Sequence, residues 1–258
     1  MSDLSLMQYG LIALVFIWSG FVRSGLGFGG AALSLPFLLL IADRPVVFLP
    51  IIGVHLLVFS SLTVWQSHRQ SQQTDEHNEG GTVDWRYLGK LLSLLLIPKL
   101  IGVFGLLTLP DAVMSGIIFV IVGGYSISYI LNKPFQSTSK PLEWLFIILG
   151  GYISGASLVG APLLIAVAAQ HVARHQLRDT LFALWFVLVC IKLGAFIIFG
   201  VDLQLLAALY LLPAAGIGHV LGLRFHAMLQ RADAKRFYRW LGWVLLITSS
   251  VGVVQVML

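Results

Sequence analysis

The chain alternates long apolar runs with short polar segments. Several runs are about 20 residues long, which is the length that a helix needs to cross a bilayer. These runs lie at residues 46–66, 86–108, 111–131, 177–200, 203–223 and 237–257. The pattern therefore predicts a helical membrane protein with at least these spans.

Two further apolar blocks, residues 5–42 and 142–172, are too long for one straight span. As single helices they would be roughly 45 to 57 Å long, against a hydrocarbon core of about 30 Å. Each contains a glycine cluster, Gly25–Gly30 or Gly155–Gly160, and glycine adopts the positive φ angles that reverse a chain. We expect each block to break there and form a helical hairpin. The hairpins are either re-entrant or fully spanning, and the short arm at 29–42 favours a re-entrant tip.

The two blocks carry the same residue pattern at a constant shift of 131. Gly20 matches Gly151, Phe21 matches Tyr152, Gly29 matches Gly160 and Leu33 matches Leu164. The chain therefore divides into two repeats, residues 1–132 and 133–258, each a glycine-tipped hairpin followed by three transmembrane helices. Three crossings is an odd number, so the second repeat is expected to be inverted relative to the first. Glycine-interrupted segments at matching positions of two halves indicate a transporter's binding site.

Composition and charge agree with an all-α polytopic membrane protein. Hydrophobic residues make up 58% of the chain, charged residues 10%, and the mean hydropathy is +0.93, whereas soluble domains carry about 25% charge. Lys and Arg gather in cytoplasmic loops. If each hairpin returns to its side of entry, all loop Lys and Arg except Arg44 fall on one face. We therefore expect both termini outside and the basic loops, with the polar loop 67–84, in the cytoplasm.

The ionisable side chains expected at membrane depth are basic or protonatable. The acidic residues all fall in tails, loops or helix ends, whereas Arg23 adjoins the first glycine cluster and Lys99 and Lys192 lie within spans. A charge at the bilayer centre costs about 2.5 to 3.5 kcal/mol or more, so it normally faces a partner or a water-filled path. With no acid nearby, the expected partner is an anion. His55 and His219, within spans of opposite halves, are candidates for proton coupling.

The hairpin tips add hydrogen-bond donors to this candidate site. A helix that restarts after a glycine tip points its N–H groups and the positive end of its dipole at the same region. The candidate substrate-binding residues are Arg23, Ser24, Gly27, Gly29, Gly30, Ser154, Ser157, Gly160, Lys99 and Lys192. Two alternatives stay open: the lysines snorkel to an interface, or the histidines bond backbone carbonyls.

Several motifs of other function classes lack the surrounding residues that those functions require. The glycines from Gly25 to Gly30 match G-x-G-x-x-G, but no βαβ unit surrounds them and no acidic residue follows about 20 positions on. No spacing ties a serine to a histidine base, and Cys190 is alone. The basic residues form no aromatic-basic platform for nucleic acid. We therefore predict no enzyme activity, no catalytic residues, no metal, no cofactor and no nucleic-acid partner.

The glycine and proline pattern resembles that of the TauE/SafE sulfite exporter-like permeases over nearly the whole chain. The resemblance is carried by Gly20 to Pro36, by its second copy Gly151 to Pro162, and by Pro98-x3-Gly102 with Pro213-x4-Gly218. It implies a permease for small sulfur-containing anions, such as sulfite or organosulfonates, in a bacterial inner membrane. In that membrane the charge distribution places both termini in the periplasm. Alternating access between the two tips is the expected mechanism. A carrier of another small anion such as a carboxylate, a cation carrier, a membrane-embedded enzyme and a non-transporting membrane subunit remain as alternatives.

The two copies of the pattern are not identical. Ser154 stands where the first copy has Arg23, and Val159-Gly160-Ala161-Pro162 departs from a full glycine pattern. Unequal roles are therefore expected for the two tips.

Overall fold

The computed structural model describes residues 4–26, 30–73, 82–133, 135–229 and 234–258, and it contains helices and no strand within them. The first half holds α1 (Leu6–Leu26), α2 (Gly30–Ile41), α3 (Pro45–Gln73), α4 (Trp85–Thr108) and α5 (Asp111–Ile130). The second half holds α6 (Lys140–Ser157), α7 (Ala161–His171), α8 (Arg174–Ile198), α9 (Leu205–Leu229) and α10 (Ala234–Met257). Each half is thus a broken pair of helices followed by three long ones, which confirms the all-α membrane fold.

Within the described ranges, seven helices are long and apolar enough to cross a membrane: α1, α3, α4, α5, α8, α9 and α10. They include all the spans predicted from the apolar runs, together with the first arm of the first hairpin. By contrast, α2 has 12 residues and α7 has 11. At 1.5 Å per residue these helices are about 18 and 17 Å long, too short for a core of about 30 Å. The short return arms therefore favour the re-entrant alternative.

The polar loop predicted at 67–84 begins later in the structure. Helix α3 continues to Gln73, and the guanidinium carbon of Arg69 lies 3.9 Å from the centroid of the Trp65 ring, one turn earlier. Such a pair stabilises a helix beyond its apolar stretch. The loop ends at Asp84, whose carboxylate accepts from the N–H of Tyr87 at 2.9 Å and caps α4. Residues 74–81 of the loop lie outside the described residues.

The helices of the two halves pack on each other in matching pairs. Helix α1 packs along α9 and α6 packs along α4, while α3 packs on α8 and α5 on α10. If each helix is replaced by its counterpart in the other half, the α1–α9 pair becomes the α6–α4 pair. The α3–α8 and α5–α10 pairs each become themselves. A Cβ atom at Gly20 would lie 2.1 Å from the carbonyl oxygen of Ala215, and one at Gly155 would lie 2.1 Å from that of Lys99. These glycines therefore allow close helix contact.

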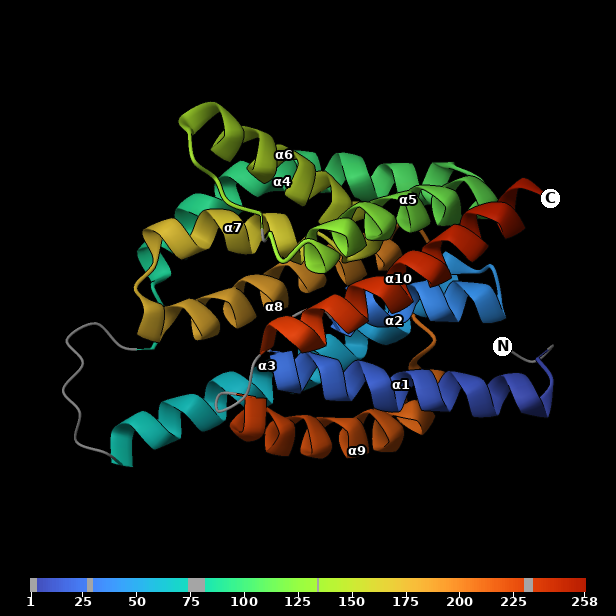
Figure 1. Ribbon diagram of the computed structural model, residues 1–258, viewed down its shortest axis with the longest axis horizontal. Helices are drawn as coiled ribbons and strands as arrows, with labels where there is room; N and C mark the ends of the chain where they lie inside the picture. The colour runs from blue at the N-terminus through green and yellow to red at the C-terminus, as the bar shows by residue number, and fades with distance from the viewer. Residues whose placement is uncertain (1–3, 27–29, 74–81, 134, 230–233) are drawn as a thin grey trace.

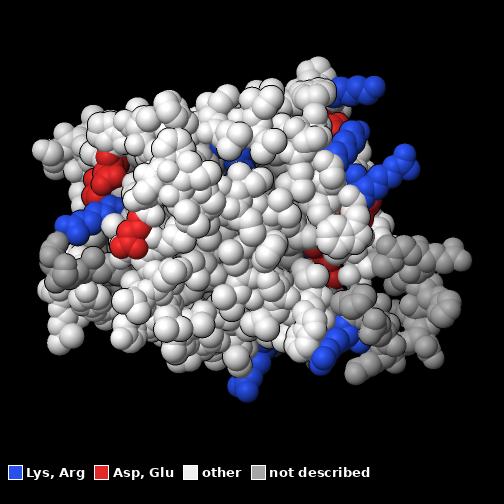
Figure 2. Space-filling view, turned by 180° about the vertical axis from the view of Figure 1, so that it is seen from behind, with Lys and Arg blue, Asp and Glu red and all other residues white. Residues whose placement is uncertain are grey.

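Figure 1 shows both chain termini at the same end of the long axis. Helix α2 lies toward that end, and α7 lies toward the opposite end. Figure 2 shows a broad belt with few charged side chains between two charged ends, with most of the visible Lys and Arg toward the end away from the termini. The inversion of the repeats across a membrane, and the repeat boundary at 132/133, stay predictions.

Candidate functional site

The tip of the second hairpin reverses the chain at Leu158. Helix α6 ends at Ser157, and Leu158 adopts the left-handed conformation (φ 60°, ψ 12°) while its N–H donates to the carbonyl of Ser154 at 3.2 Å. Helix α7 then begins with Pro162 in its first turn, a favoured position because that turn needs no N–H donor there. The break lies within the predicted cluster Gly155–Gly160.

Gly160 acts differently from the prediction. Its φ is −69°, so the reversal within the cluster does not use a positive φ at Gly160, and Leu158 has the left-handed conformation instead. A Cβ atom there would lie 2.2 Å from the carbonyl oxygen of Gly150 and 2.9 Å from the backbone nitrogen of Ser154. Glycine is therefore required for the close approach of the α7 start to α6.

The first tip joins α1 to α2, and Gly27 and Gly29 lie outside the described residues. Gly30 is the first residue of α2. Arg23 lies in the last turn of α1 and is only 4% exposed. Its guanidinium carbon lies 4.1 Å from the centroid of the Phe59 ring, and its Nη2 has no hydrogen-bond partner in the described part of the chain. A buried donor group without a hydrogen-bond partner is uncommon in proteins.

The two histidines that were candidates for proton coupling have different partners. A hydrogen bond of 2.5 Å joins Nδ1 of His219 to the hydroxyl of Ser24. His55 Nε2 donates to the carbonyl of Ala208 at 2.7 Å, so its Nδ1 carries the lone pair, and no described group bonds that atom. The backbone-carbonyl alternative therefore applies to His55. The Phe59 ring lies beside both imidazoles, with its centroid 4.9 Å from that of His219 and 6.5 Å from that of His55.

Both intramembrane lysines bond the C-terminal end of α6. Lys192 is 1% exposed, and its Nζ donates to the carbonyls of Gly155 at 2.6 Å and Ala156 at 3.1 Å. Lys99 is fully buried, and its Nζ donates to the hydroxyl and the carbonyl of Ser154 at 3.3 and 3.4 Å. These carbonyls form the negative end of the helix dipole, and that of Ser154 also accepts from the N–H of Leu158. Neither lysine snorkels to an interface.

A cavity of about 30 Å³ lies between the two tips. Arg23, Gly30 and Ala31 line it from the first hairpin, and Ser154, Leu158 and Ala161 line it from the second. Leu56 of α3 and Phe182, Trp185, Leu188 and Val189 of α8 complete the wall. On this measure one water needs about 10 to 15 Å³, so the cavity holds about two waters.

The cavity is lined by residues that the sequence repeat relates. Arg23 and Ser154 differ by 131 positions, and so do Gly30 and Ala161, which is the shift of the repeat. Ala161 was missed as a site residue, although the repeat itself places it opposite Gly30. Trp185 was also missed because α8 is apolar on all sides and no pattern indicated which face turns inward.

The electrostatics of the cavity favour negative charge. The first residues of α2 and α7 line it, so the positive ends of both helix dipoles meet there. The guanidinium of Arg23 adds a full charge, and no Asp or Glu is among the lining residues. Asp179 is buried within the protein near the start of α8, but it does not line this cavity.

The other predicted site residues lie around the cavity without lining it. This group contains Ser24, Ser157, Gly160, Lys99, Lys192, His55 and His219. The hydroxyl of Ser157 donates to the carbonyl of Ile153 at 3.0 Å, one turn back in α6. Within the described residues, no cluster of three or more His, Cys, Asp or Glu could hold a metal ion.

A family model described as Sulfite exporter TauE/SafE matches residues 12–251, which is nearly the whole chain. Comparison with curated proteins and with solved structures gave no match.

Proposed function

Because the chain belongs to the sulfite exporter TauE/SafE family, we propose that it carries a small sulfur-containing anion, most simply sulfite, across a bacterial inner membrane. As in other carriers with two related halves, the anion would bind between the hairpin tips and be exposed to each side in turn. An organosulfonate is the second substrate class that this family suggests. Both chain termini would lie in the periplasm, since the Lys and Arg gather toward the opposite end.

The observation that carries this proposal is the unpartnered Nη2 of the Arg23 guanidinium at the cavity. Arg23 is 4% exposed, and its Nη2 has no described partner. A guanidinium binds an oxyanion through two parallel charged hydrogen bonds, and the helix starts at Gly30 and Ala161 supply further N–H groups. In the absence of an acidic lining residue, an anion is the ligand that satisfies this group.

The small cavity favours a compact anion. A volume of about 30 Å³ holds about two waters, so a compact oxyanion such as sulfite fits it with less displacement of the walls than an organosulfonate with a carbon chain.

We assign the two lysines a positioning role at the second tip. Their bonds go to Ser154, Gly155 and Ala156 at the end of α6. By neutralising this negative helix end, they leave the cavity with a net positive field from Arg23 and the two helix starts. Ser154, which lines the cavity and also bonds Lys99, would contribute a hydroxyl to the anion.

Proton coupling would use His219 and Ser24. The Phe59 ring contacts both Arg23 and His219, so a proton on His219 would add positive charge beside the anion site. Proton binding and anion binding would then favour each other reciprocally. The chain carries no nucleotide-binding motif in context, so an ion or substrate gradient would drive transport.

The test is sulfite binding and flux with purified protein alone in proteoliposomes. Arg23→Lys keeps the charge but cannot form the parallel bonds, so we expect weaker sulfite binding by roughly 1.5 to 3 kcal/mol, or about tenfold to 150-fold in Kd. Arg23→Ala should weaken binding further. Arg86→Ala, at an exposed arginine at the start of α4, is the matched control. An unchanged Kd in correctly folded Arg23→Ala protein would remove Arg23 from the site, and absence of flux in the wild type would favour a non-transporting subunit.

A further inference from the structure

A second pocket lies along α7, outside the central cavity. Its volume is about 490 Å³, within the usual range of about 300 to 1,000 Å³ for ligand sites. Its lining consists of Ser128 and Tyr129 of α5, residues 135–138 of the α5–α6 connection, and Pro162, Ile165, Ala166, Ala169 and Gln170 of α7. The span from Pro162 to Gln170 corresponds to about 12 Å of helix. The pocket therefore follows most of α7.

The pocket leads from the protein surface toward the central cavity. At its outer end Gln136, Thr138 and Gln170 are exposed, whereas Ser137 and Ala166 are 5% and 7% exposed. Its innermost α7 residue, Pro162, directly follows Ala161, which lines the central cavity. Consecutive residues of the turn from Leu158 to Pro162 thus line the two spaces.

The lining requires water or a polar solute. The hydroxyl of Ser137 is buried and has no described partner. The N–H groups from Phe135 to Thr138 donate to no backbone group in the described ranges. Buried polar groups are nearly always hydrogen-bonded to protein or water, and in membranes non-helical backbone is tolerated where it lies within protein or lines a water-filled cavity. Lipid chains would leave these groups unsatisfied.

We infer that this pocket is a water-filled vestibule through which the anion reaches the central cavity from the end of the molecule opposite the termini. The turn from Leu158 to Pro162 is the barrier between the two. Leu158 is the left-handed residue of this turn, and a strained backbone of this kind is typical of segments that switch conformation. The identity of the solute rests on the proposed function, whereas the vestibule itself does not.

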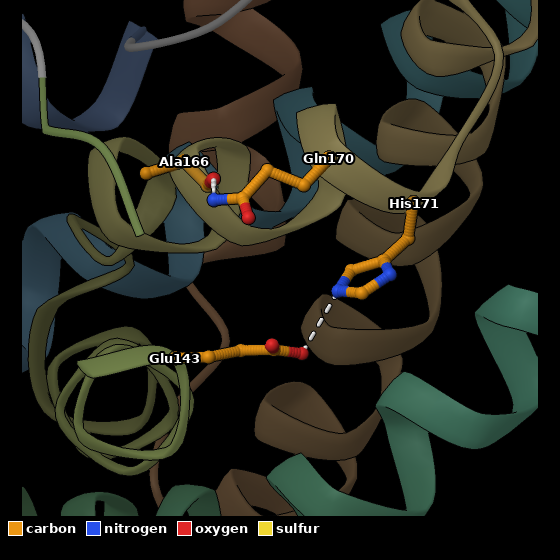
Figure 3. A network of polar contacts seen from close by, with 4 residues as sticks. All are labelled: Glu143, Ala166, Gln170 and His171. Carbon is orange, nitrogen blue, oxygen red and sulfur yellow. Dashed lines mark hydrogen bonds and ion pairs between the residues drawn. The ribbon is translucent and has the colours of Figure 1, made fainter. Parts of the chain in front are cut away.

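The outer end of α7 is held while the inner turn carries the barrier. Figure 3 shows Nε2 of His171 at 2.9 Å from the carboxylate of Glu143, the contact that ties the end of α7 to the start of α6. Gln170 folds back and donates to the carbonyl of Ala166 at 3.0 Å (Figure 3). The imidazole of His171 also stacks on Tyr87 of α4, with ring centroids 5.4 Å apart. Opening would therefore occur at the inner turn.

The test measures the reactivity of single cysteines in a Cys190→Ser background. Ala166→Cys and Ile165→Cys place a thiol in the vestibule, and Ala168→Cys, where the native side chain is 1% exposed and does not line the pocket, is the control on the same helix. Gln136→Cys marks the face that carries the α5–α6 connection. A negatively charged, membrane-impermeant methanethiosulfonate is applied to right-side-out and inside-out vesicles, with and without methanesulfonate, an organosulfonate that, unlike sulfite, does not react with the reagent.

We expect both vestibule cysteines to react at least about tenfold faster than Ala168→Cys, because thiol reactivity follows exposure, and to do so from the Gln136 face only. Equal rates for the three cysteines, or faster reaction from the face that carries the termini, would overturn the inference. Slower labelling of Ile165→Cys in methanesulfonate would support both the vestibule and a sulfur oxyanion as the substrate. Face-specific labelling that methanesulfonate leaves unchanged would support the vestibule and count against an organosulfonate as the substrate.

Discussion

Replacing Gly160 with alanine tests how the second tip is held. A Cβ atom on Gly160 would lie 2.2 Å from the carbonyl oxygen of Gly150 and 3.0 Å from the Cβ of Ser154. Since comfortable contacts between non-bonded atoms lie near 3.5 Å, the start of α7 must move by at least about 1 Å. The φ of −69° suits alanine as well as glycine, so the effect is steric only.

Overpacking of this kind costs about 1 to 3 kcal/mol, and a misplacement of about 1 Å at a site costs on the order of a hundredfold in rate. We expect Gly160→Ala to insert into the membrane, to unfold at a lower temperature, and to transport sulfite about tenfold to a hundredfold more slowly than the wild type. Gly160→Val should be more severe, because its branched side chain adds further overlap.

The assay is the initial rate of sulfite flux in proteoliposomes, divided by the amount of folded protein reconstituted, together with thermal unfolding in detergent. Gly194→Ala in α8 is the matched control, because a Cβ there meets no atom within 4 Å. Loss of a helical glycine should leave that variant as stable as the wild type, or more stable by up to about 1 kcal/mol. Normal flux and stability in Gly160→Ala would refute the close-approach argument.

Other predictions concern α6, the turn and topology. Lys192→Met should lower the unfolding temperature, because it removes the donor to the Gly155 and Ala156 carbonyls, and each unsatisfied carbonyl costs about 1 to 3 kcal/mol. The sulfite Kd, measured by calorimetry, should stay within about threefold of the wild-type value, because no charged hydrogen bond to the anion is lost. The reverse pattern would make Lys192 an anion ligand. Leu158→Gly should be more stable than Leu158→Ala by about 1 kcal/mol or more in thermal unfolding, since only glycine adopts φ 60° without cost; equal stability would show that the turn is unstrained. A C-terminal alkaline phosphatase fusion should be active and a fluorescent-protein fusion dark; the opposite result would contradict periplasmic termini.

The candidate site shows why basic residues could be found from sequence but their roles could not. Arg23, Lys99 and Lys192 stand out because each interrupts an apolar run, and all three are buried in the protein. Whether such a residue faces a cavity or a helix end depends on the rotation of its helix against its neighbours. Only Arg23 lines the central cavity, while the lysines bond the end of α6.

Local chemistry along the chain determined the helices, their lengths and the places where two of them break. Apolar run length sets a span in a bilayer of fixed thickness, and a run that is too long must bend where glycine and proline allow. The 131-residue shift also indicated two related halves before any coordinates. These properties depend on neighbours in sequence, so the sequence alone was sufficient for them.

Only the tertiary structure decided what each break residue does. The positive φ falls on Leu158. Gly160 instead allows close packing, because the carbonyl oxygen of Gly150 occupies the space that a side chain there would need. The pairing of Ser24 with His219 joins residues 195 positions apart. A contact between residues so far apart in sequence arises from the packing of α1 on α9. Both helices are apolar on most sides, so no local pattern in the chain indicates how they are rotated against each other.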